Sequence, residues 1–138
     1  MANVRRVSWS QAMRDLRGER APRAGIREER LRVTAGLRSG GALSSWLGAS
    51  GRRYVVGIHP VSASETADLD EAVMIAVRRS PDGTASVIDV TAAGAGTTRR
   101  SRLRWIAQMR TRGATEMHVH LLAENDRERE AVRRDLAC

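Results

Sequence analysis

The chain has 138 residues, with 24 basic residues against 16 acidic ones and a formal net charge of +8, which suits one domain with surplus positive charge. No apolar run approaches the roughly 20 residues that a membrane-spanning helix needs, and the first residues lack the long apolar segment of a secretory signal. The single cysteine, Cys138, excludes an internal disulfide. We therefore expect a cytoplasmic protein without a membrane partner.

The basic residues are all arginines, and they are unevenly spread along the chain. Residues 1–53 contain 12 arginines and 4 carboxylates, residues 54–98 contain 2 and 6, and residues 99–138 contain 10 and 6. A basic arm and a basic C-terminal region thus flank an acidic middle. This asymmetry favours an anionic partner, most simply nucleic acid. A coding bias toward arginine, with the arginines simply solvated, is the alternative interpretation.

Residues 1–41 predict a basic arm that is partly helical or mobile. After a capping-box pattern, one apolar helical face is predicted by Trp9, Met13 and Leu16. Ile26–Leu37 favours a second short helix, and the glycines at 40 and 41 then break the pattern. We place the domain boundary there, so that residues 42–138 form a single α+β domain.

The segment that follows predicts one short helix and three strands. Ala42–Leu47, which contains Trp46, favours the helix, and the polar Ser62–Asp70 predicts a loop or one helical turn. Residues typical of β-structure predict the three strands, which are Arg53–Val61, Ala72–Val77 and Ala85–Val90. Pro81-Asp82-Gly83 predicts a tight turn between the last two strands, because proline presets φ and glycine accepts a positive φ.

The last part of the chain predicts a helix, a strand and a final helix. A glycine loop, Thr91–Gly96, leads into a helix over Thr98–Arg112, which Gly113 ends. A fourth strand over Glu116–Leu122 and a helix over Asn125–Ala137 follow. The expected fold class is α+β, with a small antiparallel sheet of about four strands, helices on one face, and the order α-β-β-β-α-β-α after the arginine-rich arm.

The junction between the glycine loop and its helix is the main candidate site. Glycines let the backbone approach a ligand, and the free N–H groups of a first helical turn point toward it. Arginines in that turn oppose the helix dipole by about 0.3–1 kcal/mol each, a penalty that a bound phosphate would reverse. The candidate anion- or phosphate-binding residues are Gly94, Gly96, Thr97, Thr98, Arg99, Arg100 and Arg102. A flexible loop with solvated arginines is the alternative interpretation.

The last 54 residues, Ala85–Cys138, also resemble the acyl-CoA-binding region of the GNAT acetyltransferases. The matching residues are Gly94 and Gly96 in the loop, Gly113-Ala114 after the helix, and Asn125 after the next strand. The resemblance implies that the helix N-terminus receives the pyrophosphate of acetyl-CoA. The chain departs from the family at Thr91, where Arg or Gln is expected, and at Val132, near the family's tyrosine general acid.

His118-Val119-His120 is the candidate metal motif. Two histidines at i and i+2 on a strand share one face, and the pattern resembles the metal motif of HUH nucleases. Those enzymes carry a tyrosine on a later helix, and the only tyrosine here is Tyr54, upstream. We therefore assign no metal and expect both histidines on the solvent face of the strand.

Three functions remain open from the sequence. The first is a small basic module that binds a phosphate-bearing partner, most simply nucleic acid by the charge distribution, with the question of enzymatic activity left open. The second is a shortened or degenerate GNAT-like domain that binds acetyl-CoA. The third is a protein-interaction domain with a protein partner or a second copy of the chain. We take the first as the main hypothesis.

Overall fold

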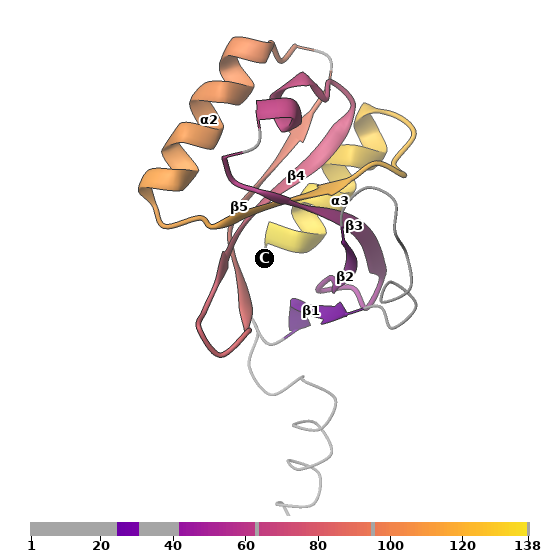
Figure 1. The fold of residues 1–138 in the computed structure, drawn as a ribbon. Helices are drawn as coiled ribbons and strands as arrows, with labels where there is room; N and C mark the ends of the chain where they lie inside the picture. Colours follow the sequence, from indigo (N-terminus) through magenta and orange to yellow (C-terminus); the bar gives the residue numbers. More distant parts are fainter. Residues whose placement is uncertain (1–24, 31–41, 63, 95, 138) are drawn as a thin grey trace, which may run out of the picture.

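The computed structural model describes residues 25–30, 42–62, 64–94 and 96–137 (Figure 1). These residues form six strands, which are β1 (Arg27–Arg30), β2 (Leu43–Leu47), β3 (Arg53–Pro60), β4 (Ala72–Arg79), β5 (Ala85–Ala93) and β6 (Glu116–His120). They also form the short 3-10 helix η3 (Ser64–Asp68) and the helices α2 (Arg99–Thr111) and α3 (Asp126–Ala137). None of the helices in this part of the chain is long and apolar enough to cross a membrane.

The six strands form one sheet in the order β1-β2-β3-β6-β4-β5, and every neighbouring pair is antiparallel. The sheet curls into a half-barrel, so that the outer strands β1 and β5 approach each other (Figure 1). Strand β4 lies between β6 and the edge strand β5, and it has six consecutive buried residues from Ala72 to Val77. A strand that is buried on both faces needs a cover on each side.

The concave face of the sheet packs against α3. Val132 and Leu136 of this helix belong to a core that includes Trp46, Val56 and Ile75 from three different strands. The C-terminal half of α3 is also fastened to the turn between β2 and β3, because the Asp135 carboxylate accepts hydrogen bonds from Tyr54 and from the side chain and backbone of Ser50. These bonds fix α3 inside the curl.

The opposite face of β4 and its neighbours packs against α2 and η3. This second core contains Met74 and Met117 from the sheet, Ile106 and Met109 from α2, and Ala67 from η3. Helices therefore cover both faces of the sheet, and the expectation of helices on one face only is wrong. The alternation of apolar side chains to both sides of β4 is the physical reason, since neither set can be left in water.

The expected number and order of strands are also wrong, because the sheet has six strands and two of them replace predicted helices. Ala42–Leu47 was expected to be helical and is strand β2, whose Trp46 indole N–H donates to His118 across the inner face. Arg27–Arg30 lies in the expected arm and forms strand β1 of the same sheet. Its sequence, Arg-Glu-Glu-Arg, lacks apolar alternation, so ion pairs with distant residues stabilise it instead.

The remaining described elements confirm the predictions to within a few residues. Strands β3 to β6, the helices α2 and α3, and the turn at Pro81-Asp82-Gly83 lie where the sequence places them. Gly83 has a φ of 92°, which a side chain would oppose. The predicted N-terminal helix and most of the arm lie outside the described residues.

Candidate nucleic-acid interface

Helix α2 is held against the molecule by one face. Ile106 and Met109 are buried in the second core, and Arg102 shares their phase, four and seven residues before them. The buried Arg102 guanidinium donates to the Ala67 carbonyl at 2.7 Å and to the Thr97 hydroxyl at 2.9 Å. It therefore joins the first turn of α2 to η3 and to the preceding loop.

Residues next to both ends of α2 cap the helix. Thr98 is the N-cap: its hydroxyl accepts from the Ser101 backbone, and the Ser101 hydroxyl accepts from the Thr98 backbone. Gly113, with a φ of 102°, ends the helix in the left-handed region. The caps define where α2 begins and ends, and its buried face fixes the rotation of the helix about its axis.

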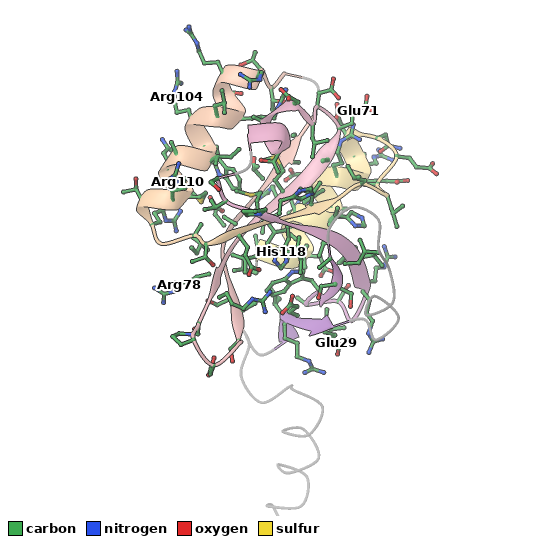
Figure 2. The ribbon with its side chains drawn as sticks, in the orientation of Figure 1. Glu29, Glu71, Arg78, Arg104, Arg110 and His118 are labelled. Atoms are coloured by element: carbon green, nitrogen blue, oxygen red, sulfur yellow. The ribbon has the colours of Figure 1, made fainter. Side chains whose placement is uncertain are left out.

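The opposite face of α2 is exposed and strongly basic. Arg100, Arg104 and Arg110 are exposed and have no ion-pair partner among the described residues. Figure 2 shows Arg104 and Arg110 on the side of α2 that points away from the sheet, with Arg78 of β4 on the same side of the molecule. Over Arg99–Thr111 the helix contains five arginines and no carboxylate.

Helix α3 provides an internal comparison for this charge. It contains four arginines and four carboxylates, and three of its arginines are paired within the helix, as Arg129–Asp126, Arg133–Glu130 and Arg134–Glu130. Its first turn holds Asp126 and Glu128, which complement the helix dipole, whereas the first turn of α2 has no acidic residue. A coding bias toward arginine would affect both helices equally, so it does not explain the unbalanced charge of α2.

The loop residues predicted to bind an anion lie in different environments. Thr97 and Thr98 are engaged in local hydrogen bonds, and the space beside Gly94 is filled by the Asp126 carboxylate, which a side chain at position 94 would overlap. Gly96 has a φ of 93° and open space around it. The loop backbone beside Gly94 is therefore already next to a carboxylate.

The three arginines predicted for this site lie on different sides of α2 and therefore have different surroundings. Arg102 points inward, Arg99 forms an exposed ion pair with Asp68 at 2.6 Å, and Arg100 is exposed without a described partner. Arg104 and Arg110, which were not among the predicted site residues, extend the exposed basic face along α2. The absence of any acidic residue between 99 and 112 is the sequence signal for it.

The two histidines of the candidate metal motif lie on the concave face and not in solvent. His118 is fully buried, and His120 is 5% exposed. The Nδ1 atom of His118 accepts from the Trp46 indole at 2.9 Å, so its Nε2 carries the proton and donates to Glu116 at 2.8 Å. His120 donates through Nδ1 to the Val55 carbonyl. Within the described ranges no three His, Cys, Asp or Glu residues are grouped to hold a metal.

His118 belongs to a largely buried hydrogen-bonded network that the sequence did not reveal. Beyond Glu116, the hydrogen-bonded network continues to Arg79 and then to Glu28 of strand β1. Both carboxylates bind the guanidinium through two hydrogen bonds, and the Gly83 carbonyl accepts a fifth. All five N–H donors of Arg79 are thus used. The network therefore links four strands, which are β1, β2, β4 and β6.

The ionisable groups of this hydrogen-bonded network make the stability of the fold depend on pH. Burial lowers the pKa of His118 below its usual 6.5, and the nearby Glu116 offsets only part of this effect. Burial alone would raise the pKa of Glu28, but its hydrogen bonds with Arg79 lower it, and the hydrogen bonds from Arg79 also lower the pKa of Glu116. All three groups are therefore most stabilising when deprotonated.

We expect the free energy of unfolding to fall as pH drops below 6.5. Between this value and the lower pKa of folded His118, the unfolded chain binds one proton more, which gives a slope of up to about 1.4 kcal/mol per pH unit. Urea unfolding at several pH values measures it. The variant His118→Gln retains one acceptor for Trp46 and one donor for Glu116 in its side chain and has no titrating group. An unchanged slope between pH 5 and 6.5 in this variant would contradict the assignment to His118.

A second exposed surface is apolar. Four of the five exposed large apolar side chains among the described residues line a groove of about 370 Å³ on the outer face of β2, β3 and β6; they are Leu43, Val55, Leu121 and Leu122. Helix α2 and η3 cover the neighbouring part of this face and leave the groove open. It is the surface that the protein-interaction alternative would use.

No protein-family model, curated protein or solved structure matches the chain. The resemblance to the GNAT acetyltransferases stays a prediction.

Proposed function

We propose that the protein is a small nucleic-acid-binding module that engages phosphates through the exposed basic face of α2. The observation that carries this proposal is the charge difference between the two helices. Helix α2 has five arginines and no carboxylate, whereas α3 balances each arginine with a carboxylate. Unpaired guanidinium groups on a rigid element gain from binding phosphate, because condensed counterions are released.

The position of this charge also supports a binding role. Cations in the first turn of α2 oppose the helix dipole, and Arg100 has no described ion pair that would offset this cost. A bound polyanion would reverse this penalty. Residues 1–24 add six arginines against two carboxylates to the same chain. A cytoplasmic location and a role without catalysis are part of this proposal.

The test is binding of fluorescently labelled nucleic acid to the full chain as a function of salt. We expect Arg100→Ala/Arg104→Ala to weaken binding to any nucleic acid about 10- to 30-fold near 0.15 M salt, and to reduce the salt slope by about 0.9 for each lost contact to duplex phosphate. The matched control is Arg52→Ala/Arg127→Ala, which removes two exposed arginines of the β2–β3 turn and α3. Equal effects of the two double variants would contradict the proposal.

The alternative is a shortened GNAT-like domain that binds acetyl-CoA at the same end of α2. The open space beside Gly96, at the loop that precedes the helix, favours it. Coenzyme A added to the binding assay separates the two functions. Displacement of the nucleic acid at micromolar coenzyme A would support the alternative, and binding that resists coenzyme A would support the nucleic-acid module.

A further inference from the structure

The exposed face of α2 has a shape as well as a charge. The midline of this face is formed by residues at helical spacing, Arg100, Arg104, Ala107 and Thr111. Two long basic side chains thus occupy its first half, and two small side chains occupy its second half. The Thr111 hydroxyl is turned back to the Ala107 carbonyl at 3.1 Å, which keeps that half of the helix narrow.

Helix α2 is also the outermost layer on its side of the molecule. It packs against η3 and β5, and Figure 1 shows it along the edge of the fold with no other element outside it. Its 13 residues make a rod of about 20 Å. A rod about 10–12 Å wide fits the major groove of B-form DNA, which is about 12 Å wide, when the side chains at the closest approach are small.

The aromatic side chains of the described residues argue against a single-stranded partner on this surface. Proteins that bind single strands stack bases on exposed aromatic rings. Within residues 25–30, 42–62, 64–94 and 96–137, Trp46 and Tyr54 are buried and Trp105 is partly buried against the second core. The described surface therefore offers no exposed tryptophan or tyrosine for stacking, which favours a duplex whose bases stay paired.

We infer that the partner is double-stranded DNA and that α2 enters its major groove, with Ala107 and Thr111 at the closest approach and the flanking arginines on the phosphates. This inference rests on the proposed function and adds the form of the nucleic acid. The major groove of an RNA duplex is deep and narrow and does not admit a helix. The protein should therefore prefer duplex DNA to duplex RNA, which electrostatic attraction alone would not produce.

The test uses the full chain and three labelled probes of one sequence: a 20-base-pair DNA duplex, the RNA duplex and the single DNA strand. We expect duplex DNA to bind at least 10-fold more tightly than the other two. The variant Ala107→Leu/Thr111→Leu keeps every charge and widens the helix, so it should lose at least 10-fold in affinity for duplex DNA and little for the others. Ala131→Leu, at an exposed position of α3, is the control and should bind like the unmodified protein.

The possible outcomes separate this inference from the proposed function. Equal binding to the three probes, or unchanged DNA binding by the widened helix, would overturn groove insertion. If Arg100→Ala/Arg104→Ala still weakened binding in that case, the basic face would remain the binding surface. If no probe bound at low salt, the proposed function itself would be wrong.

Discussion

Replacing Arg79 by alanine is expected to lower the free energy of unfolding at pH 7 by about 3–5 kcal/mol, because it leaves two carboxylates without their partner inside the protein. The side chains of Glu28 and Glu116 are only 7% and 22% exposed, and that of Arg79 is 14% exposed. Its hydrogen bonds with both carboxylates raise the pKa of Arg79 above its usual value. Urea unfolding followed by circular dichroism measures the loss.

Two controls separate this effect from the simple loss of an ion pair. Arg53→Ala breaks an exposed ion pair with Glu29, which lies next to Glu28 on β1. This variant should lower the free energy of unfolding much less than Arg79→Ala. The cost of Arg79→Ala should also shrink as pH falls below 4.5, since protonated carboxyl groups no longer need the guanidinium. A cost that is the same at pH 4 and pH 7 would show that lost packing, and not unpaired charge, explains it.

Reversing one charge on α2 is expected to stabilise the fold while it weakens the proposed binding of nucleic acid. In Arg100→Glu, a carboxylate in the first turn complements the helix dipole and lies four residues before Arg104, the favourable order for a helical ion pair. We expect a gain of about 0.5–1 kcal/mol in the free energy of unfolding. Affinity for duplex DNA should fall on the order of 100-fold, because the interface loses one cation and the new carboxylate neutralises a second.

The matched control lies at the equivalent position of the other helix. Asn125 accepts from the backbone of Glu128 and is the N-cap of α3, so Arg127 is the second residue of α3 as Arg100 is of α2. Arg127→Glu should therefore stabilise the fold slightly through the same dipole and leave DNA binding within about twofold. If both reversals weakened binding equally, net charge and not the face of α2 would determine affinity.

The parts of the fold that depend on neighbouring residues were predictable from the sequence. The cap at Thr98, the apolar spacing of α2 and the glycine after it lie within a few residues of one another. The turn at Pro81-Asp82-Gly83 is equally local. Strands β1 and β2 depend on contacts across 51 and 72 residues, those of Glu28 with Arg79 and of Trp46 with His118. No short sequence pattern indicates contacts between residues so far apart in the chain. The local residue preferences of these two segments favoured helices instead of strands.

The positions of the candidate site residues on α2 were predictable from the sequence, but their surroundings were not. The sequence pointed to the first turn of α2, and its basic residues do lie there. Arg102 points inward because it shares the phase of Ile106 and Met109, and this spacing was already visible in the sequence. The Asp126 carboxylate beside Gly94 was not visible, because it arrives from a helix that packs on the other face of the sheet.

Contact between α2 and nucleic acid can be observed in a titration of the isotope-labelled protein with duplex DNA, followed residue by residue through backbone amide NMR shifts. We expect the largest shifts on residues 99–112, and we expect α3 and the groove around Leu43 and Leu121 to change little. Largest shifts on that groove, with α2 unaffected, would overturn the proposed function of α2 and would assign the binding surface to the outer face of β2, β3 and β6 instead.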